Sequence, residues 1–339
     1  YTEENTLSLH DALPILTITR LLRHAVFGLG LAASTAASAA YSQLYVFGDS
    51  LSDVGNNAIA LPLVLGPGVT PNAAIGSNDF IPLYTYSSGR YSNGPVWAEV
   101  FAQQLGTGPL LPSLAGGTGF AHGGANTGGV DDVPTLRDQV NGFIARPGGA
   151  PSDALYVIAG GGNNVRDIAL QVLAGADPAA TIAAGAADYL NDVVTMLGQL
   201  QAEGARRFVV WNTPNLGLTP FGRSLGAAGS GLLTGISAAL GGTLFNGLAG
   251  IDGVSLFDVY GLITDVAAHP ANYGLSNVDD ACIAGACDVD TQLFWDGLHP
   301  TAAAHEIIAN AMLRTVPEPA SALLALWGLS ALALRRRRA

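Results

Sequence analysis

The sequence predicts an α/β fold in which helices cover both faces of a central parallel sheet of about five strands. Short apolar runs rich in β-branched residues alternate with amphipathic or alanine-rich stretches of helical length. Polar turns follow several of these runs, at the positions where open α/β sheets carry their chemistry. Because the middle of the chain shows no internal repeat, we expect one large domain.

The expected strands are apolar segments that end at glycine, proline or polar residues. The first strand leads directly into a Gly-Asp-Ser turn, which presents a serine at the end of the sheet. The five segments are Gln43–Gly48, Gly119–Ala121, Ala154–Ala159, Arg207–Trp211 and Val254–Val259.

The expected helices are Val96–Leu105, Val133–Ala145, Ala179–Glu203, Leu225–Leu248 and Thr301–Leu313. Residues 56–92 are rich in proline, glycine and asparagine and are predicted to form a long loop. Its aromatic residues either line an apolar substrate groove or hold the loop against the domain; they are Phe80, Tyr84, Tyr86 and Tyr91.

The chain is acidic and contains no lysine, so all 14 basic residues are arginine. Residues 41–314 hold 8 Arg against 22 Asp and Glu, a net charge of −14. Such a domain repels nucleic acid and anionic membrane surfaces, so we expect no nucleic-acid partner. We interpret the acidity as a feature of solubility or habitat rather than a sign of a cationic substrate.

The two cysteines, Cys282 and Cys287, lie in a glycine-containing segment. They are too few for a zinc site, which needs four ligands, and no histidine pair with a metal-binding spacing accompanies them. A small disulfide ring is expected, with two free thiols as the alternative. A disulfide indicates an oxidising compartment. We predict neither a metal nor a cofactor.

The beginning of the chain is predicted to lie outside the folded domain. Residues 1–19 show no convincing pattern and are interpreted as a non-native leader or artefact. Residues 20–40 combine two arginines, an apolar run and an Ala-Ser-Ala-Ala end, which together predict a secretory signal peptide. Residues 41–315 then form the domain.

Four polar segments carry candidate chemistry: Gly48–Asn56, Phe120–Asn126, Gly161–Asn164 and Asp296–Pro300. Each follows a predicted strand or lies on the final loop, so all four can converge on one site. In this arrangement His299 is the candidate base for Ser50, and Asp296 is the candidate orienter of His299. The Ser50 and Gly124 backbone N–H groups and the Asn163 side chain are candidate oxyanion donors.

The four segments, in this order, resemble the GDSL or SGNH family of serine esterases and lipases. The resemblance covers nearly all of residues 41–314. It implies a three-layer α/β/α sandwich similar to flavodoxin, an acyl-enzyme on Ser50, a triad completed by Asp296 and His299, and no cofactor. Residues 90–97 and 245–248 also resemble the lipase and haemolysin-like branch, which favours lipid or acyl ester substrates.

One position departs from the family pattern, because Asn164 stands where an aspartate is usual. We expect activity to survive, since Asn163 is intact. His122 is also unusual and is expected to be structural, while His269 and His305 are expected to be surface or structural histidines. Asp49 and Asp53 are interpreted as turn and helix-cap residues.

A competing motif is Gly222–Gly226, which matches the Gly-x-Ser-x-Gly elbow around Ser224. That elbow requires a strand immediately before its serine, and a proline-containing loop precedes this one. Two other functions stay open at this point: an inactive surface or matrix-binding protein on the same fold, and an acyltransferase that uses the same serine.

The end of the chain combines Pro317-Glu318-Pro319, an apolar stretch and four arginines. This arrangement over residues 316–339 resembles the PEP-CTERM sorting signal. The resemblance implies export to the periplasm, cell surface or medium, transient membrane anchoring and cleavage by an exosortase. A plain tail anchor is the alternative, for which the apolar stretch is short.

Overall fold

The computed structural model describes residues 41–65, 89–282 and 287–316. The predicted leader and signal peptide and nearly all of the predicted sorting tail lie outside these residues, as do Phe80, Tyr84 and Tyr86. The strands are β1 (Leu44–Gly48), β2 (Leu155–Ala159), β3 (Phe208–Trp211), β4 (Val254–Phe257), β5 (Asn277–Ala281) and β6 (Gln292–Phe294).

The helices are α2 (Asn56–Leu65), α3 (Trp97–Leu105), α4 (Leu136–Ile144), α5 (Gly162–Leu173), α6 (Pro178–Ala202), α7 (Pro220–Ser224), α8 (Gly226–Leu248), α9 (Val259–Ala268) and α10 (Ala302–Thr315). Short 3-10 helices occur at Ser113–Ala115, Leu216–Leu218 and Pro270–Tyr273.

The main sheet is parallel with the strand order β1-β2-β3-β4. The strand predicted at Gly119–Ala121 is reduced to isolated parallel bridges of Gly119, one of which joins it to Val46 at the free edge of β1. Backbone N–H groups of Phe120 and His122 donate to Val46 and Gly48, at 2.7 and 3.1 Å. With this edge segment counted, the chain order across the sheet is 2-1-3-4-5, the flavodoxin-like order with its switch point between β1 and β2.

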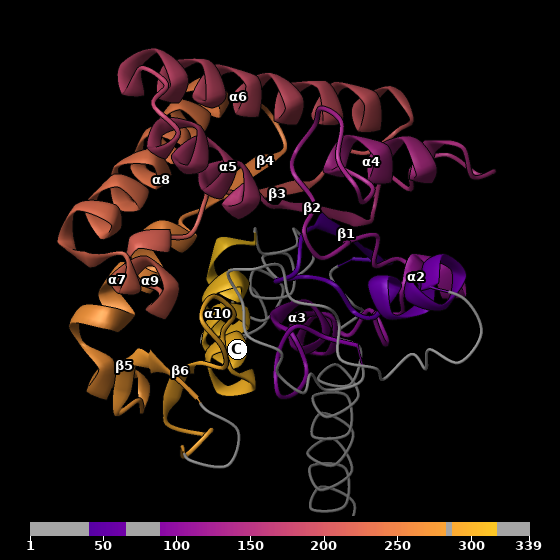
Figure 1. Ribbon diagram of the computed structural model, residues 1–339. Coiled ribbons are helices and arrows are strands. Elements are labelled where there is room, and N and C mark those ends of the chain that lie inside the picture. Colours follow the sequence, from indigo (N-terminus) through magenta and orange to yellow (C-terminus); the bar gives the residue numbers. More distant parts are fainter. Residues whose placement is uncertain (1–40, 66–88, 283–286, 317–339) are drawn as a thin grey trace, which may run out of the picture. The chain divides into compact units, whose positions relative to one another are not determined.

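Helices form a layer on each face of the sheet, which makes the predicted three-layer α/β/α sandwich (Figure 1). Helices α4, α5, α6 and α8 lie on one face, and α3 and α10 lie on the other. Tyr45, Tyr156 and Phe208 pack under the first layer, whereas Trp211 contacts Trp97 of α3 with ring centroids 4.5 Å apart.

Several helices begin at the residues that local chemistry favours. In α6, Asp177 accepts the Ala180 N–H at 2.7 Å and proline follows it. In α10, Thr301 accepts the Ala304 N–H at 3.2 Å. The predicted ranges of both helices therefore agree with the structure to within about two residues.

Several segments differ from the sequence-based expectation, among them the unpredicted β5, β6 and α7. Residues 56–65, predicted as loop, form α2, because the Asp53 carboxylate accepts the N–H groups at its start. The fourth strand ends at Phe257, since Asp258 caps α9 by accepting the Gly261 N–H at 2.8 Å. Helix α5, which begins within the third polar segment, was not predicted.

Among the described residues, α8 is long and apolar enough to cross a bilayer by length and composition alone. Its residues Leu233, Ile236, Leu240, Leu244 and Leu248 are buried in the main hydrophobic core. This spacing of three and four residues is that of a core-facing helix stripe. We therefore interpret α8 as a core helix of the sandwich.

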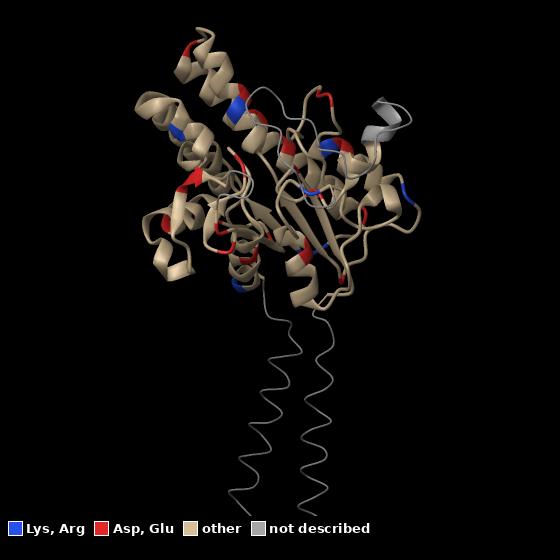
Figure 2. Ribbon diagram, turned by 60° about the horizontal axis from the view of Figure 1, so that its bottom comes forward, with Lys and Arg blue, Asp and Glu red and all other residues tan. Residues whose placement is uncertain are grey.

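Asp and Glu positions occur in many parts of the ribbon, and Arg positions are fewer (Figure 2). This distribution agrees with the acidity expected from the sequence.

Candidate active site

Ser50 lies in the turn that leaves β1 at the carboxyl edge of the sheet. The Ser52 N–H donates to the Asp49 carbonyl at 3.0 Å, and the Leu51 N–H donates to the Asp49 carboxylate at 3.0 Å. These two bonds tighten the turn around the serine. Ser50 is 9% exposed, so the protein encloses most of this residue.

His299 and Asp296 come from the loop between β6 and α10, and they meet Ser50 in space. The His299 Nε2 atom lies 2.8 Å from the Ser50 Oγ atom. The His299 Nδ1 atom lies 2.6 Å from Asp296 Oδ2. The three side chains thus form one hydrogen-bonded chain in a nearly water-free setting, since Asp296 is 0% exposed and His299 is 2% exposed.

Backbone groups hold the aspartate in place. Asp296 Oδ1 accepts the N–H groups of Leu298 and His299, each at 2.6 Å. Burial raises the pKa of Asp296, but the charge of His299 and these hydrogen bonds outweigh it, so the pKa lies below its ordinary value. An ionised carboxylate at this position favours the imidazole tautomer that carries its proton on Nδ1 and presents Nε2 as an acceptor.

Asn163 lies in the first turn of α5 and lines the same pocket as Ser50 and His299. Its Nδ2 donates to the Ala125 carbonyl at 2.9 Å. A carboxamide nitrogen has two N–H groups, so one remains for a ligand. The bond to Ala125 also ties Asn163 to the loop of residues 122–127, here called the oxyanion loop.

Gly124 sits in the oxyanion loop with a φ of 91°, a backbone conformation that favours glycine. It is not part of the pocket lining. Within the described ranges, neither its N–H nor that of Ser50 donates a hydrogen bond to the protein. Both groups therefore remain candidate donors to a ligand.

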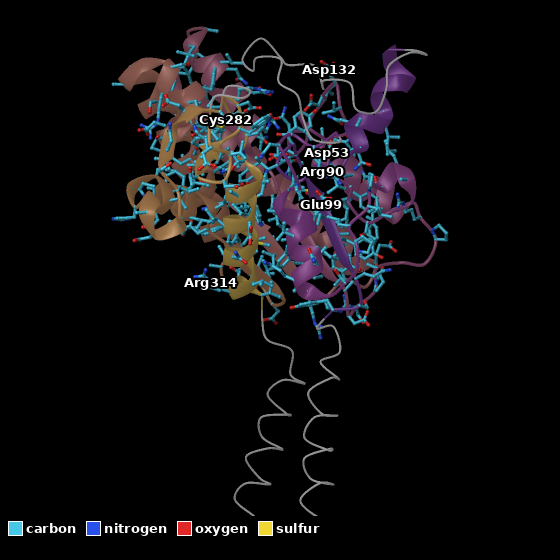
Figure 3. The ribbon with its side chains drawn as sticks, turned by 90° about the horizontal axis from the view of Figure 1, so that it is seen from below. Asp53, Arg90, Glu99, Asp132, Cys282 and Arg314 are labelled. Atoms are coloured by element: carbon cyan, nitrogen blue, oxygen red, sulfur yellow. A yellow bond between two sulfur atoms is a disulfide. The ribbon has the colours of Figure 1, made fainter. Side chains whose placement is uncertain are left out.

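Asp53 holds the oxyanion loop against the start of α2. It is fully buried and accepts the Gly123 N–H at 3.0 Å and the Asn56 N–H at 2.7 Å. Burial raises its pKa to about 6 despite these bonds. Figure 3 shows Asp53 close to Arg90 and Glu99, which form an ion pair at 2.6 Å.

Asn164, the departure from the family pattern, binds Thr127 twice. Its Oδ1 accepts the Thr127 N–H and its Nδ2 donates to the Thr127 hydroxyl, both at 3.1 Å. That hydroxyl donates to Asp192 at 2.9 Å. An amide suits this position because it both accepts and donates, while the carboxylate of the network is supplied by Asp192 on α6.

Apolar side chains form most of the pocket beside Ser50. They come from the turn after β3, from α9, from β6 and from α10, and they include Leu216, Val259, Ile263, Phe294, Leu298 and Ile308. None of these residues stood out in the sequence, because each belongs to an ordinary apolar pattern.

The competing serine lies in a different setting. Ser224 ends the short helix α7, and its hydroxyl donates to the Phe221 carbonyl at 2.7 Å. The preceding element is a 3-10 helix at Leu216–Leu218 rather than a strand, so the elbow interpretation lacks its required context.

The other histidines do not join Ser50. His122 is buried and its Nδ1 lies 2.9 Å from Asn57 Oδ1, while burial lowers its pKa to about 4. His269 is exposed and pairs with Asp265. Within the described part of the chain, no group of histidine, cysteine and acidic residues is arranged to hold a metal ion.

Cys282 and Cys287 form a disulfide. The bonded pair belongs to a small apolar cluster with Tyr91 and Trp295. The Tyr91 ring lies 5.1 Å from the His299 ring, centroid to centroid, and the Trp295 N–H donates to the His299 carbonyl at 2.8 Å. The disulfide therefore braces the loop that carries the histidine.

Comparisons with known proteins agree with this geometry. Residues 44–312 match the model of the GDSL-like lipase/acylhydrolase family. The chain is 27% identical over 342 residues to a GDSL esterase/lipase of Arabidopsis thaliana, covering 86% of this chain and 94% of that protein. It is 32% identical over 324 residues to esterase EstA of Pseudomonas aeruginosa, covering 82% of this chain and 47% of that protein.

Among solved structures, phospholipase A1 from Streptomyces albidoflavus NA297 aligns with a TM-score of 0.41 and 14% identity, covering 82% of this chain and 100% of that one. The match to the family model spans most of the chain and includes all four polar segments. The protein therefore belongs to the GDSL-like lipase/acylhydrolase family and is a carboxylic ester hydrolase.

Proposed function

We propose that this protein is an exported serine esterase that cleaves acyl or lipid esters through an acyl-enzyme on Ser50. The hydrogen-bonded chain from Ser50 Oγ through His299 to Asp296, at 2.8 and 2.6 Å, carries the proposal. An isolated serine is a weak nucleophile, and an adjacent base oriented by a carboxylate is the usual means of activating it.

In the first half of the reaction, His299 Nε2 takes the Ser50 proton as Oγ bonds to the ester carbonyl carbon. The carbonyl oxygen becomes an anion, and His299 then gives its proton to the departing alcohol. In the second half, water bonds to the acyl carbonyl carbon and gives a proton to His299. The bond from that carbon to Ser50 Oγ then breaks, His299 returns the proton to Oγ, and the acid leaves. Asp296 stabilises the charged imidazole in both halves without taking its proton.

The oxyanion requires fixed donors around it. The Ser50 N–H, the Gly124 N–H and the second Asn163 N–H are proposed for this role, because all three are available and carried by rigid elements. One such donor is typically worth on the order of 100- to 1,000-fold in rate.

The substrate acyl chain is proposed to enter the apolar pocket beside Ser50. The resemblance of residues 90–97 and 245–248 to the lipase and haemolysin-like branch supports acyl esters as the substrate class.

Export is proposed from three features. The disulfide suits an oxidising compartment. Residues 20–40 have the pattern of a signal peptide, and residues 316–339 resemble a PEP-CTERM signal that an exosortase-type enzyme would process. Transient anchoring in the membrane through that tail follows from the same resemblance.

The test is hydrolysis of p-nitrophenyl esters from acetate to palmitate by the purified protein and by Ser50→Ala. We expect the variant to lose at least about 1,000-fold in kcat. The chain-length profile of the wild-type protein then separates an esterase from a lipase. Ser224→Ala, at an exposed serine, is the matched control and should keep full activity.

Each alternative has its own outcome. Activity that survives in Ser50→Ala refutes the nucleophile. A folded wild-type protein without turnover on any ester favours the inactive, matrix-binding alternative. Ester exchange that outpaces hydrolysis when an alcohol is added identifies an acyltransferase.

A further inference from the structure

Gln139 of α4 binds both backbone groups of Gly48, the residue that precedes the nucleophile turn. The Gly48 N–H donates to Gln139 Oε1 at 2.9 Å, and Gln139 Nε2 donates to the Gly48 carbonyl at 2.9 Å. Gly48 ends β1, two residues before Ser50. Gln139 is 3% exposed, so both bonds are shielded from water.

The Gln139 carboxamide accepts the backbone N–H that a neighbouring strand would otherwise accept. Along the outer edge of β1, the Val46 N–H donates to Thr118 and the Phe120 N–H donates to Val46. The next bond in a parallel ladder would run from the Gly48 N–H to a carbonyl of the edge segment. Instead, that N–H donates to Gln139, while the His122 N–H still donates to the Gly48 carbonyl at 3.1 Å.

The same turn of α4 also holds the oxyanion loop. The Leu136 N–H donates to the Asn126 carbonyl at 3.0 Å, and the Arg137 N–H donates to the Thr127 carbonyl at 3.1 Å. Gln139 Nε2 bonds the Pro134 carbonyl as well, at 3.1 Å. One helical turn therefore contacts both segments that carry backbone oxyanion candidates.

Neither partner has room to shift. A Cβ atom on Gly48 would lie 2.5 Å from the Ala159 carbonyl oxygen, so this peptide already packs tightly against β2. Helix α4 is capped by Thr135 and buries Leu136, Val140 and Phe143 in the core. The Gln139 side chain thus connects two fixed bodies.

We infer that Gln139 is a positioning residue that sets the spacing between the Ser50 and Gly124 backbone donors. The inference rests on the proposed function of Ser50. It predicts that loss of the Gln139 contacts weakens stabilisation of the tetrahedral oxyanion more than it weakens substrate binding.

The test compares Gln139→Met with the wild-type protein. Methionine keeps the length of the side chain and removes both hydrogen-bonding groups. We expect kcat for p-nitrophenyl butyrate to fall about 10- to 100-fold, because small displacements of catalytic groups cost rate on this scale. KM should change less than about threefold. A boronic acid, which forms a tetrahedral adduct on the serine, should bind more weakly by a factor similar to the loss in kcat.

The matched control is Gln199→Met on α6. Gln199 donates to Asn141 near the other end of α4 and bonds no part of the site. The inference is overturned if kcat and boronic acid affinity in Gln139→Met stay within threefold of this control. It is also overturned if kcat falls while boronic acid affinity does not.

Gln139→Glu gives a second test that does not depend on the methionine variant folding. A protonated glutamic acid can accept from the Gly48 N–H and donate to its carbonyl, whereas the carboxylate cannot donate. We expect the ratio of its kcat to wild-type kcat to rise as the pH is lowered from about 8 to about 5.5. A ratio independent of pH contradicts the inference, whereas survival of activity in Ser50→Ala contradicts the proposed function instead.

Discussion

The buried carboxylate of Asp49, next to the nucleophile, should lower the unfolding free energy at neutral pH. Asp49→Asn measures this effect. Asp49 is 3% exposed. Burial raises its pKa from the ordinary 3.8 to about 6, against the opposing effects of the Leu51 N–H and the charge of His299.

The direction of the pH dependence follows from this shift. The folded protein holds the Asp49 proton more tightly than the unfolded chain does, so the resulting stabilisation is complete below about pH 4. It is lost as the pH rises through about 6. A difference of about two pKa units corresponds to about 3 kcal/mol at neutral pH. Asparagine is uncharged throughout and keeps an oxygen for the Leu51 N–H.

The assay is urea unfolding of both proteins in steps from about pH 4 to about pH 8. We expect the difference in unfolding free energy to grow from near zero to about 1–3 kcal/mol in favour of Asp49→Asn, or roughly 2 to 4 °C in Tm for each kcal/mol. Groups other than Asp49 titrate in both proteins, so their effects on the difference in unfolding free energy largely cancel.

Asp53→Asn is the control, because its pKa is also raised to about 6 but its second oxygen accepts the Gly123 and Asn57 N–H groups. An amide nitrogen cannot accept these bonds, so this variant should be less stable at neutral pH. A difference for Asp49→Asn that is constant with pH, or a variant less stable than wild type at about pH 7.5, would refute the reasoning.

Three further predictions follow from the site and its surroundings. Asp296→Asn should lower kcat by roughly 1,000- to 10,000-fold with an unchanged circular dichroism spectrum, because an amide nitrogen facing His299 favours the wrong tautomer; a loss below tenfold contradicts this. Replacing Cys282 and Cys287 by serine opens a six-residue ring and should cost about 2 kcal/mol of unfolding free energy. The measurement is the urea midpoint, which should fall; an unchanged midpoint contradicts this. His305→Leu should raise the unfolding free energy by about 1 kcal/mol, since His305 is fully buried with both ring nitrogens unbonded; a destabilised variant would show that the imidazole is bound in solution.

Much of the sandwich could be predicted because buried parallel strands are continuous apolar runs. Helix α6 was also predictable, since Asp177 and Pro178 mark its start. Helix α2 was not, because its composition is that of a loop and its cap comes from Asp53, which also binds the distant Gly123. The length of the edge strand at Gly119–Ala121 was overestimated, because Gln139 accepts the Gly48 N–H and only isolated bridges of Gly119 form there.

The predicted site residues were found from short motifs. The structure brings Ser50, Asn163 and His299 to one pocket, and Asp296 contacts His299 from outside the pocket lining. Gln139 lies 91 residues from Gly48 in the chain and belongs to no motif. The sequence did contain one indication of its role, since Gln139 occupies a core-facing position of α4 between Leu136 and Val140. A polar residue in an apolar stripe implies a buried hydrogen-bonding partner, but the partner itself depends on the tertiary fold.

The proposed nucleophile and its base are 249 residues apart in the chain, and the base directly precedes the last described helix, α10. In the proposed export, the amino end would cross the membrane first, so Ser50 would emerge early and His299 only when nearly all of the domain has passed. The contact between them closes one of the longest loops in the fold, and such contacts form late in folding. On the proposed mechanism, the chain would remain inert toward lipid esters in the membrane it crosses until translocation is almost complete.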